Sequence, residues 1–180
     1  MAANSKKKYE LTDETMKIAG RVLHRIKALR DFGDVKAGDL GGWIGSEYNL
    51  GHECHAWVYG DAKVYGDAKV SGDAKVCGTA IVSGDAKVCG KAKVHGEACI
   101  YGNAIILGNA DVGGSASIKG RAAVYGNAEI SGDTVIQDNA QICGNAIVRG
   151  NVEIWGDVKV CGTAMVDCDD IIIGDIIISK

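Results

Sequence analysis

The sequence predicts an all-β protein, a parallel β-solenoid wound from short strands, and three observations lead to this prediction. The chain has 26 Gly and no Pro among its 180 residues. Although 47% of the residues are apolar, only 6% are aromatic, and an interior of Ala, Val and Ile suits closely stacked strands better than helices. The third observation is an uninterrupted six-residue repeat that begins near Cys54 and runs to Ser179.

Residues 1–50 are the first predicted unit, a capping segment, and residues 51–180 are the second, the hexapeptide-repeat solenoid. A solenoid needs a cap because its first coil otherwise leaves an apolar surface uncovered. Strand-forming residues on both sides of an Ala19–Gly20 turn predict a β-hairpin over residues 16–29. The Gly-rich segment 31–44 indicates turns that lead into the first coil.

The six-residue units have a fixed pattern, and each position has a physical reason. The fifth position is Val or Ile in all 21 units between Cys54 and Ser179, the third is Ala in 16, and the first is Gly in 18. Positions three and five lie on the same side of a strand, so we expect both to face inward. Gly followed by Asp or Asn predicts a corner, because Gly adopts positive φ freely and Asx side chains bond to nearby backbone. We expect each short strand to pair with the copy one whole coil later, which makes a solenoid.

The repeat weakens near the C-terminus. In the unit Cys168–Ile173, Asp170 takes an inward position, and the last strands carry Ile on both sides. An open apolar edge invites pairing with another chain. We therefore expect a subunit or another partner to cover this end.

The units from Gly60-Asp61-Ala62-Lys63-Val64-Tyr65 onward resemble the left-handed parallel β-helix family of bacterial hexapeptide-repeat proteins. The resemblance covers about residues 54–179 and implies a left-handed, triangular solenoid of about seven coils, each built from three of the six-residue units. Residues 28–44 also resemble the N-terminal segment of uncharacterised bacterial and bacteriophage β-helix proteins, often labelled as transferases. This second resemblance implies a phage or prophage setting, and not a reaction. Family members commonly form homotrimers, so the resemblance implies a homo-oligomer, with a trimer favoured.

Composition argues against several classes of partner. The net charge is −3 and the isoelectric point is near 5.8, which gives no basic surface for a nucleic acid polymer. No run of about 18 apolar residues suggests a membrane span, and the N-terminal residues lack a secretory pattern. We expect a cytoplasmic protein, in the host cytoplasm if a phage encodes it.

Cysteine usage favours free thiols and no metal. The seven Cys are an odd number without paired spacing, although Cys143 and Cys161 lie one coil apart in one column and could be oxidised together. His52, Cys54 and His55 offer metal ligands, but no second cluster completes a tetrahedron. We predict no metal site there.

A coil of three units assigns the outward residues to three faces, and two of the resulting groups are candidates for binding. Apolar side chains around one corner indicate an oligomer interface, because contiguous exposed apolar patches usually mark interfaces; scattered single residues would need no explanation. The predicted interface residues are Ile81, Cys99, Tyr101, Ile105, Leu107, Ala123 and Tyr125.

Four basic side chains form the second group, and they are the candidate site for a small anionic, nucleotide-like ligand: Lys75, Lys91, Lys93 and His95. The alternative is a solvated Lys face that balances nearby corner Asp residues. A third pattern is structural, because stacked Asn109, Asn127 and Asn145 predict an amide ladder.

Two functions remain open. The favoured hypothesis is a non-catalytic, oligomeric binding or scaffold protein that holds a small anion or a partner protein on its faces and in the grooves between subunits, with no cofactor. The alternative, implied by the resemblance, is an acyltransferase that uses acetyl-CoA, with His95 as base and Glu97 to orient it. The unbroken repeat leaves no inserted loop to shape an acceptor site, which favours binding or sequestration over catalysis.

Overall fold

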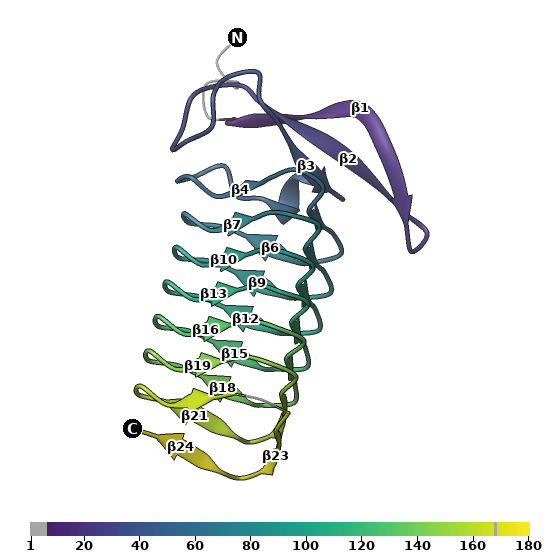
Figure 1. Cartoon of the computed structure of the whole chain (residues 1–180). Helices are drawn as coiled ribbons and strands as arrows, with labels where there is room; N and C mark the ends of the chain where they lie inside the picture. The colour runs from purple at the N-terminus through teal and green to yellow at the C-terminus, as the bar shows by residue number, and fades with distance from the viewer. Residues whose placement is uncertain (1–6, 168) are drawn as a thin grey trace.

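The computed structural model describes residues 7–167 and 169–180, and it is a parallel β-solenoid of about eight coils (Figure 1). Three parallel sheets form its sides, and we call them the first, second and third walls in the order in which the chain visits them from Trp57 onward. Most strands of the walls are only two residues long, and those of the inner coils pair in parallel with the strands one coil before and one coil after them. The predicted all-β class and solenoid architecture are confirmed.

The strands of the walls recur in regular order. The first wall contains β4 (Trp57–Val58), β7 (Lys75–Val76), β10 (Lys93–Val94), β13 (Asp111–Val112), β16 (Glu129–Ile130), β19 (Ile147–Val148) and β22 (Met165–Val166). The second wall contains β3 (Leu40–Ile44), β5 (Lys63–Val64), β8 (Ile81–Val82), β11 (Cys99–Ile100), β14 (Ser117–Ile118), β17 (Val135–Ile136), β20 (Glu153–Gly156) and β23 (Ile171–Gly174). The third wall contains β6 (Lys69–Val70), β9 (Lys87–Val88), β12 (Ile105–Ile106), β15 (Ala123–Val124), β18 (Gln141–Ile142), β21 (Lys159–Cys161) and β24 (Ile177–Ser179).

The interior follows the predicted columns. The inward Val and Ile side chains of the first seven coils are buried, and so are the Ala side chains two residues before them. Backbone hydrogen bonds run from one coil to the next, as when Lys63 N donates to Ala80 O at 2.9 Å. Each coil therefore depends on its neighbours above and below for both its core and its hydrogen bonds.

Corner glycines are required by conformation and by space. Gly78 has φ of 70°, and a Cβ built there would lie 2.7 Å from the carbonyl oxygen of Gly96 on the next coil. Asp138 occupies the equivalent corner position with φ of 60°, and its carboxylate accepts a hydrogen bond from Gly156 N at 3.1 Å. An Asx residue can therefore replace Gly where its side chain gains a backbone partner.

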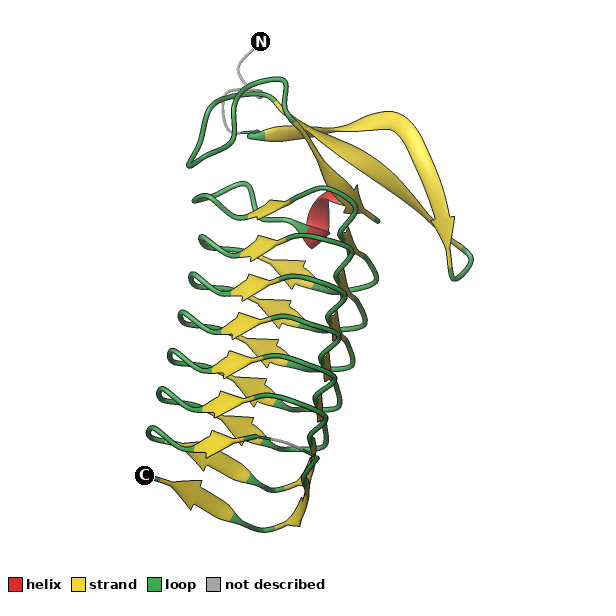
Figure 2. Cartoon of the chain, in the orientation of Figure 1, coloured by secondary structure: helices red, strands yellow, loops and turns green. Residues whose placement is uncertain are grey.

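A β-hairpin precedes the coils, and it is longer than predicted. β1 (Tyr9–Ile18) and β2 (Arg21–Ala28) pair antiparallel around the predicted turn, where Ala19 and Gly20 both have positive φ. The hairpin projects sideways beyond the stacked coils (Figure 2). It continues the second wall, because β2 pairs antiparallel with β3.

The segment over residues 31–44 is not only a series of turns. β3 pairs in parallel with β5, so the second wall begins one coil before the first six-residue repeat that the sequence shows. Gly41 and Gly42 lie within this strand, and a Cβ on Gly41 would lie 2.6 Å from Ile26 Cγ1 and 2.7 Å from Trp57 Cζ2. These glycines allow the strand to pack closely against its neighbours. The predicted turn was therefore wrong for residues 40–44, which form β3.

The cap has its own small core. Tyr9 is fully buried and donates to the carbonyl of Leu50 at 2.8 Å, just after the short 3₁₀ helix η1 (Glu47–Asn49). Lys8 is also fully buried, and its ammonium donates to Ala56 O at 2.7 Å and lies 5.0 Å from the centre of the Phe32 ring. The cap thus covers the first coil with packed rings and one buried cation.

The last described coil is open. Ile171 and Ile177 are 67% and 70% exposed, and Asp170 is exposed as well, although the repeat places it inward. β20 and β23 have four residues each, which makes them longer than the two-residue strands of the preceding coils. Cys168, part of the weakened repeat, lies outside the described residues. No helix within the described residues is long and apolar enough to cross a bilayer.

Candidate functional site

The predicted basic site lies on the first wall, where side chains of β7 and β10 and the residues after them line a hollow of about 300 Å³. Lys75, Lys93 and His95 line this hollow together, as predicted, and Lys91 is not part of the lining. The remaining lining residues are Asp34, Tyr59 and Cys77. The first wall positions these groups because residues one coil apart stand directly above one another.

Asp34 changes the charge of this hollow. Lys75 Nζ donates to both Asp34 oxygens at 2.9 Å, and the Tyr59 hydroxyl donates to the same carboxylate at 2.8 Å. The hydrogen bonds from Lys75 and Tyr59 lower the pKa of Asp34, whereas burial, followed by the Asp34 contact, raises the pKa of Tyr59. The ammonium of Lys75 is thus already paired with an anion from the cap.

Lys91 stands at the corner between the third and first walls, one coil after Asp73. The Asp73 carboxylate lies 2.9 Å from His55 Nδ1, and this contact is the main cause of the lowered pKa of Asp73; the charge of Lys91 contributes least. Three of the four predicted basic groups therefore have a carboxylate nearby: Lys75 has Asp34, Lys91 has Asp73, and His95 has Asp111. Within the described residues Lys93 forms no ion pair, and His95 keeps Nδ1 for a further partner because Asp111 contacts its Nε2.

His95 is oriented by a carboxylate on the next coil. Its Nε2 lies 2.7 Å from Asp111 Oδ1, and both side chains are partly exposed. The ring packs over Gly113, where a Cβ would collide with the imidazole. Glu97, the carboxylate suggested by the sequence, makes no hydrogen bond to this ring among the described contacts.

A second hollow of about 270 Å³ lies on the other side of His95, lined by that residue together with Asp111, Glu129, Ile130 and Ser131. Asp111 and Gly113 were not predicted as neighbours of His95. The 18-residue coil spacing could have predicted them, because residues 111 and 113 stand one coil after residues 93 and 95.

Cys77 is a half-buried thiol in the first hollow. Burial raises its pKa, and the nearby Asp111 charge acts in the same direction. The thiol is therefore the favoured form at neutral pH, and the side chain serves as an apolar wall of the hollow. This environment does not suit a nucleophile.

The predicted interface residues lie on two walls that meet at one corner, which we call the second corner, between the second and third walls. Ile81 and Cys99 are paired neighbours on the second wall, and Ile105 and Ala123 are paired neighbours on the third. Tyr101 stands at the corner between them and is 38% exposed. The other two predicted residues, Leu107 and Tyr125, follow β12 and β15 at the far corner of the third wall, so the prediction that all seven surround one corner is wrong for these two.

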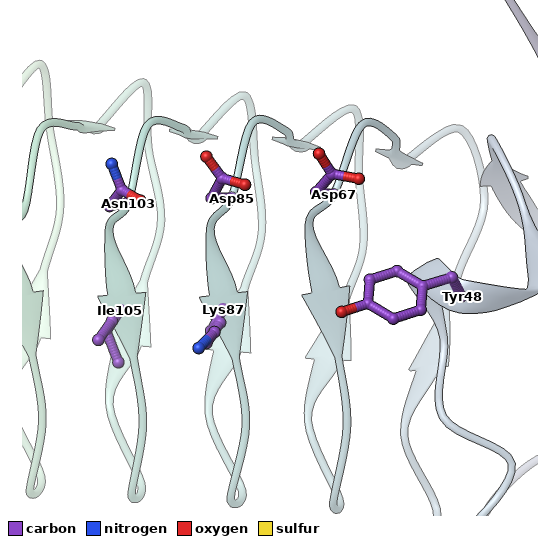
Figure 3. A pocket seen from close by; sticks show the side chains of 6 residues that line it. All are labelled: Tyr48, Asp67, Asp85, Lys87, Asn103 and Ile105. Atoms are coloured by element: carbon purple, nitrogen blue, oxygen red, sulfur yellow. The ribbon is translucent and has the colours of Figure 1, made fainter.

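A hollow of about 550 Å³ lies beside the second corner (Figure 3). Asp67, Asp85 and Asn103 follow one another along the corner, with Lys87 and Ile105 on the adjoining wall. Tyr48 of η1 closes the end of the hollow nearest the cap. This hollow was not predicted from the sequence, although its two Asp residues are spaced by one coil.

Other predicted contacts have clear outcomes. The amide ladder is confirmed, since Asn109 donates to Asn127 and Asn127 donates to Asn145, each at 2.8 Å. Cys143 and Cys161 are free thiols, as are the other four cysteines that the structure describes.

The His52 ring stacks on Tyr9 at 4.4 Å, and His55 contacts Asp73. Among the described residues, no group of three His, Cys, Asp or Glu side chains is arranged to hold a metal.

Comparison with known proteins adds one short match. A family model described as the YdcK beta solenoid repeat matches residues 140–152, a segment that includes β18 and β19. No curated protein matches the chain. The match agrees with the β-solenoid fold and names no activity for this chain.

Proposed function

We propose that the chain is a non-catalytic, self-associating hexapeptide-repeat protein that works by binding at the outward surfaces of its solenoid. The observation that carries this proposal is the apolar surface of the second corner. Cys99 and Ile81 adjoin Tyr101 there, and Ile105 continues the surface onto the third wall. A contiguous apolar surface on a structure with polar outward columns is typical of a protein interface.

Mass measurement tests this proposal. We expect light scattering to give a multiple of the 18.7 kDa chain mass at micromolar concentration. Tyr101→Lys should shift the mass toward the monomer, because a charge would be buried without a partner. Met165→Lys is the matched control, since Met165 is 53% exposed on the first wall, and its mass should equal that of the wild type. A monomeric wild type would refute self-association.

The ligand part of the proposal concerns the hollow of Asp34, Tyr59, Lys75, Cys77, Lys93 and His95. A small anionic, nucleotide-like molecule would take its hydrogen bonds from Lys93 and from His95 Nδ1, because Asp34 uses the contacts of Lys75 and Asp111 lies against His95 Nε2. In a phage setting, such a protein would sequester a small host signal or act as an adaptor. Native mass spectrometry of the purified protein should reveal a bound small molecule that Lys93→Met loses and that denaturation releases unchanged.

Acyl transfer is the second candidate, favoured by one observation. The short contact between His95 and Asp111 resembles a base held by an orienting carboxylate, and the ring is open to solvent on the first wall. An acyltransferase of this kind would bind acetyl-CoA and turn it over. His95→Gln would then abolish turnover with an unchanged circular dichroism spectrum. The absence of acetyl-CoA binding by calorimetry would eliminate this candidate.

A further inference from the structure

The second corner carries an acidic and a basic residue at equal distances from its middle residue, Asn103. Its outward corner residues, one per coil, are Asp67, Asp85, Asn103, Arg121, Asn139, Asp157 and Asp175. Asp85 stands one coil before Asn103, and Arg121 stands one coil after it. Because adjacent coils are about 4.8 Å apart, the acid and the base stand at equal distances on opposite sides of Asn103.

Neither charged group has a side-chain partner in the part of the chain that the structure describes. Asp85 and Arg121 are exposed, and within the described residues neither forms an ion pair or a side-chain hydrogen bond. Farther along the same corner the pattern differs, since Asn139 donates to Asp157 at 2.8 Å. The two charges nearest the middle of the corner are thus available to another molecule.

The middle of the corner is apolar. Tyr101 stands beside Asn103, and Cys99 and Ile105 lie on the two adjoining walls at nearly the same height. The apolar side chains therefore occupy the centre of this surface, with the acid on one side and the base on the other. Docking surfaces commonly have this arrangement, because a dry centre and charged edges give both affinity and orientation.

The large hollow lies on the acidic side of this centre. Asp67 and Asp85 contribute two carboxylates to its lining, and Lys87 contributes one ammonium, so the local balance is negative (Figure 3). The volume of about 550 Å³ has room for a guanidinium group and its aliphatic stem. A bidentate guanidinium is the cation best suited to carboxylates in such a position.

We propose that two copies of the chain pair along the second corner in antiparallel orientation, about a two-fold axis that passes near Asn103. Each Arg121 then enters the hollow of the other copy beside Asp85, and the two Tyr101 side chains meet at the centre. A two-fold interface requires a surface that complements itself, which this order of charges provides. A parallel pairing would place Asp85 beside Asp85 and Arg121 beside Arg121, so like charges would repel.

This inference rests on the proposed self-association and specifies its geometry. A charge exchange tests it by sedimentation or light scattering over a concentration series. Asp85→Arg and Arg121→Asp should each raise the dimer dissociation constant by about tenfold or more, because each creates two like-charge contacts. The double variant restores opposite charges across the axis and should return within about threefold of the wild type. Asp61→Arg, a matched exposed change at the corner between the first and second walls, should have no effect.

Cysteine cross-linking tests the orientation independently. In a Cys99→Ser background, Asn103→Cys should form a disulfide between copies when diamide oxidises the two thiols. Asn139→Cys should not, because an antiparallel pair would separate the two copies of residue 139 by about four coil spacings, or about 19 Å. Cross-linking of both variants would indicate a parallel pair and overturn the proposal, and so would cross-linking of neither.

The outcomes separate the two proposals. A wild type that is monomeric at all concentrations refutes self-association and this inference together. A trimer, or an oligomer that the charge variants leave intact, retains self-association and overturns the antiparallel pair. A dimer that is weakened by both single variants and rescued by the double variant supports both.

Discussion

His95 and Asp111 stand on successive coils of the first wall, with 2.7 Å between the imidazole Nε2 and the carboxylate Oδ1. Gly113 makes this contact possible, because its missing side chain leaves space for the ring. Both functional hypotheses for the first wall depend on this orientation, since it determines which ring nitrogen faces solvent.

Gly113→Ala should displace the His95 ring and break its contact with Asp111. The added methyl group would occupy the space of the imidazole, while the backbone at position 113 has an ordinary φ and is not strained. The ¹⁵N chemical shifts of the His95 ring should change toward those of a solvated imidazole. Ser131→Ala, at the same column position one coil later, is the control and should leave the His95 shifts unchanged. Unchanged shifts in Gly113→Ala would contradict the packing.

Ile100→Ala should destabilise the solenoid by about 2–5 kcal/mol, because Ile100 is fully buried and the substitution leaves a cavity. Cys99→Ala changes the adjacent outward residue of β11 and should cost below about 1 kcal/mol. Urea unfolding monitored by circular dichroism measures both. Similar losses for the two variants would mean that residues 99 and 100 do not face opposite sides of the wall.

Gly78→Ala should cost about 3 kcal/mol, more than Gly20→Ala at about 1 kcal/mol. Both glycines have φ near 70–75°, so both substitutions strain the backbone. At Gly78 the new Cβ also approaches Gly96 O at 2.7 Å, whereas at Gly20 no atom of the described residues lies within 4 Å. Thermal unfolding of the two variants thus isolates the effect of coil-to-coil contact from backbone strain, and equal losses would exclude a contribution from that contact.

Stability should rise with pH between about 8 and 10 because of Lys8. Burial lowers the pKa of Lys8 from 10.5 to about 8, so in this range the unfolded chain binds more protons than the folded one. Raising the pH therefore favours the folded state, by up to about 3 kcal/mol across the full interval. Lys8→Met should be more stable than the wild type at pH 7.5 and should lose this rise. Parallel pH profiles for the two proteins would show that Lys8 is not buried as a charged group.

The repeat made most of the fold predictable, because the Val or Ile at the fifth position of each six-residue unit marks a strand and its buried side. Val64, Val82 and Ile100 are buried where the columns place them, and Gly78 turns the corner as expected. The strand β3 was not predictable in the same way. Its Gly41 reads as a turn residue in the sequence, and its contact with Ile26 and Trp57 becomes visible only in three dimensions.

The candidate site was predictable only in part. The grouping of Lys75, Lys93 and His95 followed from the three-unit coil, and the structure brings them to one hollow. The partner of Lys75 did not follow, since Asp34 is 41 residues away and belongs to a loop without a repeat. Asp111, by contrast, could have been found by extending the same column logic by one coil.

The register of three units per coil has a consequence for how such a chain can change length. Removing or duplicating one whole coil would shorten or lengthen the solenoid by one coil and leave each later residue in its original column. Residues such as His95 and Arg121 would therefore stay on the same wall or corner. An insertion of a single six-residue unit would instead move every later residue onto the adjacent wall. The outward columns would then be broken, while the inward alternation of Ala and Val would be preserved. Modular growth by whole turns is thus the route by which this architecture tolerates large indels without losing its surface chemistry.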